Sequence, residues 1–345
     1  MAEILGLGMT HAPMFQFPDA SMADILRRHL ARPNLPAEWK DGRAWPEAMR
    51  AEWGDDQGLA AAARHRERVV ASFRRMRAAL DDFAPDFVLV FGDDQYENFR
   101  EDLVPPFCAF LYDRLECRPF ANSRAMDATA NVWGQPPDKV VTVRGHREAA
   151  SELATALIDA DFDIAYAYTP HHHQGLAHAF LRTLVYLDYD QRGFDYPLIP
   201  FHVNCYGSEL MARAPGPTPA NVPPAPTPRR CWDLGRALGQ IIARSKYRAA
   251  LIGSSSWSHA FLTPAHHGLY PDIAADRARF AELTGGATRA WRDLTRPQLE
   301  AAGQHELLNW ICLAGALEGR RPDYADMAET WIFNSTKVSA LWLPA

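Results

Sequence analysis

Four side chains that can bind metals or transfer protons lie beside apolar stretches of this chain: His11, Gln95, His259 and Glu306. Neutral imidazole is a common ligand of iron, zinc and copper, and histidine also exchanges a proton near neutral pH. A carboxylate at the start of an otherwise apolar helix, as at Glu306, is costly to bury unless it is paired or bound to a metal. Two histidines and one carboxylate match the ligand set of non-haem Fe(II), which leaves positions open for substrate and oxygen.

Each of these side chains also has an ordinary structural explanation. The run Asp93-Asp94-Gln95 is equally typical of a turn that caps a helix, and Glu306 can simply compensate the dipole at a helix N-terminus. His171-His172-His173 is unusual, but consecutive side chains point different ways, so a solvated run is the alternative to a metal site. His173 and His178 lie around the start of a predicted helix, where an uncharged imidazole can face an anionic substrate.

Other catalytic schemes have weaker support in the sequence. Ser254, Ser255 and Ser256 lack the GxSxG nucleophile elbow, and no cysteine lies in a histidine-containing signature. A GxGxxG motif after a strand and a GxxxxGK[ST] motif are both absent, which argues against dinucleotide and P-loop nucleotide binding.

The elements that must position these residues follow from the hydrophobic pattern. Apolar runs that end in polar residues predict five buried strands, at 4–9, 87–91, 164–168, 198–203 and 249–252. Helical spacing predicts helices between and after them, at 57–83, 145–160, 176–187, 231–244 and 304–317. The alternation predicts an α/β fold with a mostly parallel or mixed sheet covered on both faces. Ligands of such sheets bind beyond the carboxyl ends of the strands, so we expect all five polar ends to form one site.

Two segments interrupt the alternation. Residues 14–56 contain several prolines, the tryptophans at 39, 45 and 53, and a short helical stretch at 22–30, and we expect them to form an inserted helical cap over the site. Residues 214–229 hold seven prolines in sixteen residues, which predicts an extended surface loop. We expect one large domain over residues 1–345.

Composition limits the partners and the compartment. The 345 residues carry 36 Lys and Arg against 42 Asp and Glu, a net charge of −6, so we expect no nucleic-acid partner. The N-terminus lacks a signal sequence, and no apolar run approaches the ~18 residues of a membrane helix, so we expect a cytoplasmic protein that does not contact membranes. The five cysteines form no CxxC pair and are odd in number, which favours free thiols over disulfides or a zinc ribbon.

Seven short motifs, in order along nearly the whole chain, resemble the class III extradiol dioxygenases, the superfamily of the protocatechuate 4,5-dioxygenase catalytic subunit. Each motif alone is weak, whereas the ordered set is specific. They are Thr10-His11-Ala12-Pro13, PDFV at 85–88 with GDDQYENF at 92–99, PLIPFHVN at 197–204, RCWDLG at 230–235, WSH at 257–259, ELLNW at 306–310 and FNS at 333–335.

The resemblance implies roles for individual residues. His11 and Glu306 fall on iron ligands, and His259 falls on the active-site acid/base. The second histidine ligand of the family belongs to an Asn-Asp-His motif, and Gln95 occupies that position here. His178 or His173 would orient the bound oxygen, although the family's histidine before a glycine near the third strand is matched by Gln174 in this chain.

The glutamine leaves three possibilities for the metal, because an amide oxygen is a weaker donor than imidazole and suits harder cations. In the first, Gln95 ligates iron loosely and the protein remains an oxygenase. In the second, Asp94 or a histidine of 171–173 completes the metal site instead. In the third, the metal is lost or exchanged and the scaffold performs other chemistry.

The function expected from the resemblance is that of an Fe(II)-dependent extradiol ring-cleaving dioxygenase. Its partners would be O₂ and a small catechol-like or aminophenol-like aromatic, and we expect a homo-oligomer, dimer or larger. The alternatives are a metal-dependent hydrolase or lyase on the same scaffold, in which a different divalent ion polarises a carbonyl or activates water, and a non-catalytic binding protein. The presence of both His259 and Glu306 argues against the last.

Overall fold

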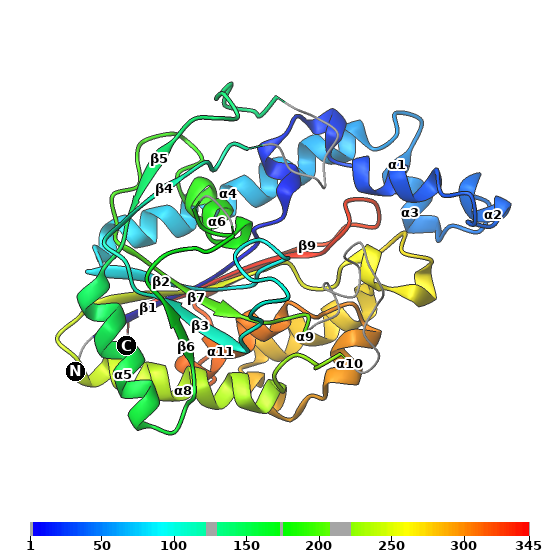
Figure 1. Ribbon diagram of the computed structural model, residues 1–345. Coiled ribbons are helices and arrows are strands. Elements are labelled where there is room, and N and C mark those ends of the chain that lie inside the picture. Colours follow the sequence, from blue (N-terminus) through cyan, green and yellow to red (C-terminus); the bar gives the residue numbers. More distant parts are fainter. Residues whose placement is uncertain (1–2, 122–129, 173–174, 208–221, 345) are drawn as a thin grey trace.

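A mixed sheet of eight strands forms the centre of the protein (Figure 1). The structure is a computed structural model, and it describes residues 3–121, 130–172, 175–207 and 222–344. The strand order is β6-β3-β7-β2-β8-β1-β10-β9. The strands of this sheet are β1 (Ile4–Met9), β2 (Phe87–Gly92), β3 (Phe107–Phe110), β6 (Ala165–Ala167), β7 (Leu198–Val203), β8 (Ala249–Ser254), β9 (Tyr324–Ala328) and β10 (Lys337–Trp342). A separate hairpin pairs β4 (Arg114–Cys117) with β5 (Val141–Arg144).

Helices cover both faces of the sheet. One face packs against α4 (Leu59–Phe83) and α6 (His178–Leu187). The other packs against α5 (Arg147–Asp159), α8 (Pro228–Arg244), α9 (Ile273–Gly285), α10 (Arg296–Ala301) and α11 (Leu307–Ala316). The α/β fold with a mixed, doubly covered sheet predicted from the sequence is therefore confirmed. None of the described helices is long and apolar enough to cross a membrane.

The continuous apolar runs of the central strands follow from this double covering. Along β2, Phe87, Leu89 and Phe91 join the core under α8 and α11, whereas Val88 and Val90 join the core under α4 and α6. Successive side chains of a strand point to opposite faces, so a strand buried on both faces must be apolar throughout.

The expectation that all five predicted strands end at one edge of the sheet was wrong for the strand predicted at 164–168. Strands β1, β8, β2 and β7 are mutually parallel, so their carboxyl ends share one edge. Strand β3 is antiparallel to β7, however, and β6 is parallel to β3. The carboxyl end of β6 therefore lies at the opposite edge. The sequence could not predict this, because an apolar run indicates a strand but not its direction. Strands β9 and β10, which the pattern did not predict, add an antiparallel edge beside β1.

Glycines let α11 approach the sheet and α8 very closely. A Cβ on Gly8 of β1 would lie 2.2 Å from the Trp310 ring of α11. A Cβ on Gly235 of α8 would lie 1.9 Å from the backbone carbonyl oxygen of Cys312. The Leu-Gly-Leu-Gly alternation of β1 thus leaves one face bare for α11, the helix that begins just after Glu306.

The interrupting segments are partly as predicted. Residues 14–56 contain the short helices α1 (Asp24–Leu30), α2 (Ala37–Lys40) and α3 (Glu47–Trp53), and Trp39 packs on His267 with ring centroids 4.9 Å apart. That this segment is a functional cap remains a prediction.

Of the predicted loop 214–229, residues 214–221 lie outside the described part. Its last two residues belong to α8 instead, because Pro228 suits the first turn of a helix and the Thr227 side chain accepts a hydrogen bond from the Arg230 backbone N–H.

The cysteine prediction is confirmed. All five cysteines are buried free thiols.

Candidate metal and acid–base site

Three neighbouring parallel strands and one helix bring the predicted site residues together. His11 follows β1, Gln95 follows β2, His259 follows β8, and Glu306 immediately precedes α11. His11 and Glu306 are 2% and 1% exposed, and His259 is 6% exposed. The sequence-based expectation that the strand ends converge is thus met for β1, β2 and β8.

Glu306 is the centre of the arrangement, and its two oxygens have different surroundings. Oε1 accepts hydrogen bonds from the Tyr206 hydroxyl and from Nε2 of Gln95, the latter at 3.1 Å. Oε2 has no hydrogen-bond partner among the described residues. It lies 3.5 Å from Nε2 of His11 and 3.6 Å from Nε2 of His259. A buried carboxylate oxygen without a donor is costly unless a cation or a proton completes it.

Both histidines present an unprotonated nitrogen to that oxygen. Nδ1 of His11 lies 3.1 Å from the Ser254 carbonyl, and Nδ1 of His259 lies 2.9 Å from the Trp257 carbonyl. A carbonyl can only accept, so each Nδ1 carries the proton and each Nε2 offers a lone pair. The lone pairs of His11 and of the Glu306 oxygen therefore face each other without a donor between them, as those of two ligands of a divalent cation do, and the His259 lone pair faces the same oxygen.

The pKa shifts agree with this charge distribution. Burial, together with the nearby His178 and Arg182, lowers the pKa of His11 well below its ordinary value, and burial lowers the pKa of His259 to about 3. Both imidazoles are therefore neutral at physiological pH. Burial raises the pKa of Glu306 to about 7. The site thus holds an acidic group that resists ionisation and basic groups that resist protonation, because all three are buried.

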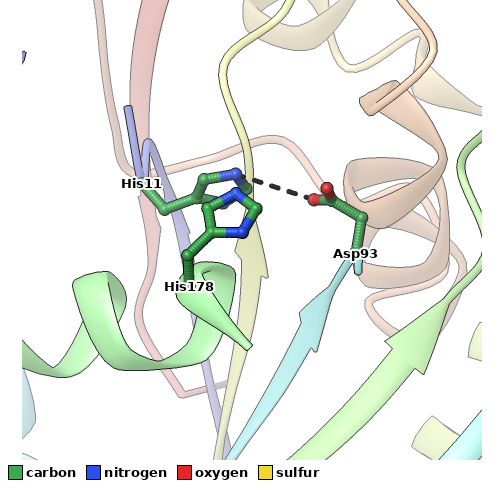
Figure 2. A group of neighbouring side chains, drawn as sticks. All are labelled: His11, Asp93 and His178. Carbon is green, nitrogen blue, oxygen red and sulfur yellow. Dashed lines mark ion pairs between the residues drawn. The ribbon is translucent and has the colours of Figure 1, made fainter. Parts of the chain in front are cut away.

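Asp93 also faces this space, which the sequence reasoning did not anticipate (Figure 2). Its Oδ1 lies 3.6 Å from Nε2 of His11 and accepts a hydrogen bond from Nδ2 of Asn309 at 3.3 Å. Asp93 is fully buried, and burial and the Glu306 charge raise its pKa well above the ordinary value. Ligand atoms of His11, Asp93 and His178 all lie within 4.8 Å of one another. The only sequence signal was its position directly after a buried strand.

Asp94, one of the alternatives for completing the site, points elsewhere. Its carboxylate accepts hydrogen bonds from the backbone N–H groups of Glu97 and Asn98, at 2.9 and 2.7 Å. It therefore has the turn-capping role that was the structural alternative for this stretch. The consecutive histidines, the other alternative, contact a different carboxylate. His172 bonds Asp102 at 2.7 Å, and His171 lies 3.8 Å from the same carboxylate. Among the described histidines of this run, His171 and His172 thus pair with Asp102, and His173 lies outside the described residues.

His178 reaches the site from α6, on the other face of the sheet. Its ring is edge-on to the His11 ring, with centroids 5.0 Å apart. Its Nδ1 lies 2.6 Å from the Glu97 carboxylate. Burial alone would lower the pKa of His178, but the Glu97 carboxylate outweighs burial and the net shift is upward. His178 is thus suited to donate a hydrogen bond into the site.

The loop that carries His259 is held by buried polar groups. The His259 backbone N–H donates to the Gly303 carbonyl at 2.9 Å, and the neighbouring Ser258 N–H donates to Asp276 at 3.0 Å. Lys337, 1% exposed, donates from Nζ to the carbonyls of Phe333 and Ser335. These contacts, together with the His259–Ser335 bridge, fix the imidazole beside Glu306.

Comparison with known proteins gives several related enzymes, whereas no family model matches the chain. A 2,3-dihydroxyphenylpropionate/2,3-dihydroxicinnamic acid 1,2-dioxygenase of Paraburkholderia xenovorans is 29% identical over 245 residues, which is 69% of this chain and 66% of the relative. The enzyme of the same name from Comamonas testosteroni is 29% identical over 66% of this chain and 58% of the relative. That of Photorhabdus laumondii is 26% identical over 58% and 51%.

The matched region thus spans about half to two thirds of the length of these relatives. They are named as 1,2-dioxygenases of dihydroxylated aromatic acids, and this similarity agrees with the resemblance carried by the ordered motifs. This chain is therefore similar to dioxygenases of dihydroxylated aromatic acids, in agreement with its resemblance to the class III extradiol dioxygenases.

Proposed function

We propose that the protein is a metal-dependent ring-cleaving dioxygenase that acts on a catechol-like or aminophenol-like aromatic with O₂. One observation carries the proposal: Nε2 of His11, Nε2 of His259 and the unpartnered Oε2 of Glu306 converge in a buried site at the carboxyl edge of the sheet. The relatives named as dioxygenases of a dihydroxylated aromatic acid support the same reaction class.

The proposed cofactor is Fe(II), held by His11 and Glu306. When bound, a ferrous ion would bring both hydroxyls of a catechol and O₂ to the same centre. The resemblance implies Gln95 as the remaining ligand, whereas its Nε2 faces oxygens of Glu306, Tyr206 and Asp93.

The chain's own residues supply the proton transfers. His259 is neutral and has a free Nε2, so it accepts the proton of a substrate hydroxyl at the centre of the site. His178, fixed by Glu97, donates a hydrogen bond to substrate or oxygen from the opposite side. His173 has the same proposed role, by resemblance alone.

The test is oxygen uptake by the anaerobically purified, Fe(II)-loaded protein with a panel of catechols and aminophenols. We expect uptake with at least one compound and the absorbance of a ring-opened semialdehyde. His259→Asn should lower kcat by about 10²–10⁴-fold, the usual contribution of general acid–base catalysis, with the bound metal unchanged. Absence of both metal binding and oxygen uptake in the wild-type protein would refute the proposal.

A hydrolase or lyase is the second candidate, favoured by the additional carboxylate at Asp93. A site with two carboxylates suits a harder ion that polarises a carbonyl or activates water. Turnover of a test compound under argon, with no oxygen consumed in air, would identify this function instead.

A further inference from the structure

We propose that Asp93, rather than Gln95, is the third protein ligand of the metal, so that the ion is held by His11, Asp93 and Glu306. This inference rests on the proposed function only in assuming that the site binds a divalent ion. It replaces the neutral amide expected from the resemblance with a second carboxylate, and it changes which metals the site should prefer.

The positions of the donor atoms support Asp93. Nε2 of His11, which has a free lone pair, lies 3.6 Å from Oδ1 of Asp93 and 3.5 Å from Oε2 of Glu306. Metal–ligand bonds of about 2.1 Å separate neighbouring ligand atoms by roughly 3–3.5 Å, so both oxygens are close to ligand spacing without a large movement. The nitrogen thus has one oxygen of each carboxylate within 3.6 Å.

The contacts of Gln95 favour a different role for its amide. Its Nε2 lies 3.1 Å from Oε1 of Glu306 and 3.2 Å from the Tyr206 hydroxyl. If the amide were turned over, its carbonyl oxygen would face the Glu306 carboxylate, acceptor against acceptor. Gln95 therefore acts as a donor that fixes Oε1, which leaves Oε2 of the same carboxylate directed at the histidines.

The surroundings of Asp93 are those of a supported ligand. Asn309, on α11, donates to Oδ1 of Asp93 and at the same time to the carbonyl of Ser254, at 3.2 Å. The Ser254 carbonyl in turn accepts from Nδ1 of His11. One amide therefore orients both proposed ligands, as outer-shell partners of metal sites do. Without a cation, two fully buried carboxylates beside each other would be expensive.

The ligand set predicts a metal preference. One imidazole and two carboxylates form a harder, more oxygen-rich set than two imidazoles and one carboxylate, and such sets suit Mn²⁺ as well as Fe²⁺. We therefore expect the protein to bind Mn²⁺ with an affinity comparable to that for Fe²⁺.

The test compares three single variants with the wild-type protein: Asp93→Asn, Asp94→Asn and Gln95→Met. Asp94 is the matched control, because it is the same residue one position along, loses the same charge, and does not face the site. Metal-free proteins are titrated anaerobically with Mn²⁺ and with Fe²⁺ by calorimetry. The electron paramagnetic resonance spectrum of bound Mn²⁺ is recorded at saturation, and the thermal transition of each metal-free protein checks its fold.

Asp93→Asn should weaken Mn²⁺ binding by more than the ~10–100-fold that loss of an outer-shell partner causes. It should also change the spectrum of the ion that still binds. Asp94→Asn should leave the Mn²⁺ affinity within about threefold of the wild-type value. Gln95→Met should weaken Mn²⁺ binding by ~10-fold, as loss of an outer-shell partner does, and leave the spectrum of bound Mn²⁺ unaltered. If Asp93→Asn does not fold, Asp93→Ser provides the same comparison.

Two results would overturn the inference: wild-type affinity and spectrum in Asp93→Asn, or a larger loss in Gln95→Met than in Asp93→Asn. A wild-type protein that binds neither ion would refute both this inference and the proposed function. A protein that binds Mn²⁺ through Asp93 but consumes no oxygen would refute the function alone.

Discussion

At the scale of single residues, the carboxylate of Glu306 is oriented by donors to Oε1, the oxygen that does not contact His11 or His259. Tyr206, fully buried against the site, donates its hydroxyl to Oε1, and its ring stacks on His305 with centroids 5.6 Å apart. Burial and the Glu306 charge raise the pKa of Tyr206 well above its ordinary value, so the phenol stays protonated and remains a donor.

Tyr206→Phe should therefore weaken Mn²⁺ or Fe²⁺ binding by about tenfold, because Glu306 loses an orienting donor. The measurement is metal titration of the metal-free protein. Tyr112→Phe is the matched control, since the buried Tyr112 hydroxyl has no hydrogen-bond partner among the described residues. Equal metal affinity in the two variants would show that the Tyr206 hydroxyl does not support the site.

The structure brings together His11, Gln95, His178, His259 and Glu306, all predicted from the sequence as site residues, but the sequence did not indicate Asp93 or Tyr206 beside them. His11, His259 and Glu306 each lie at a boundary between apolar and polar residues, which is visible in a linear pattern. Asp93 and Asp94 have the same residue type and adjacent positions, and only the backbone path after β2 decides which one faces His11. Tyr206 follows β7 within a polar end that was predicted, but its contact with Glu306 spans 100 positions of sequence.

At the scale of elements, the contact between α8 and α11 places the start of α11 at the site. Gly235 and Gly239 of α8 meet the backbone of α11 at Cys312 and Ala316, and Gly315 of α11 meets the backbone of α8. Side chains larger than hydrogen at these positions would push the two helices apart.

Gly235→Ala should lower the free energy of unfolding by at least about 1–3 kcal/mol, because its Cβ would overlap backbone that cannot rotate away. The control is Gly285→Ala at the end of α9, where a Cβ would meet nothing within 4 Å and the change should be neutral or stabilising by up to about 1 kcal/mol. Urea denaturation measures both. Equal stabilities would mean that α8 and α11 are not held at this close spacing.

Most of the central elements could be predicted from apolar periodicity, but strand direction and the polar strands could not. The bounds of β1 and β7 match the sequence-based prediction, and β2 and β8 differ only at their ends. Strand β10 begins with the buried Lys337 and includes Ser339, so its pattern does not resemble a core strand. Lys337 is buried because Nζ bonds two backbone carbonyls, a compensation that exists only in the folded chain.

At the scale of the whole molecule, buried ionisable groups make stability depend on pH. Asp276 is fully buried, and burial raises its pKa from 3.8 to about 7. Its folded pKa lies above its unfolded pKa, so its contribution to stability is fully present below pH 4. That contribution is lost as pH rises to about 7, because the unfolded chain ionises first.

A rise of the pKa from 3.8 to about 7 corresponds to a loss of about 4 kcal/mol. Asp276→Asn should therefore be more stable than the wild-type protein at pH 8 and about equally stable at pH 4, since an amide oxygen can still accept from Ser258 and Gln304. Denaturation of the metal-free proteins across this range tests the prediction. Glu67→Gln makes the same change in charge on the exposed face of α4 and should not alter how the free energy of unfolding changes with pH. If Asp276→Asn showed the same pH dependence as the wild-type protein, Asp276 would not be the group responsible.

The bare glycine face of β1 has a mechanical consequence. Gly8 contacts the Trp310 ring with no side chain between them, and the Trp310 indole donates to the Ser255 carbonyl at 3.1 Å. These contacts join the end of β1, the end of β8 and the start of α11. We therefore expect local opening to change the spacing between His11 and Glu306 little. His178 belongs to α6 on the opposite face, so local opening of that helix would change its distance from the carboxylates without disturbing the rest of the site.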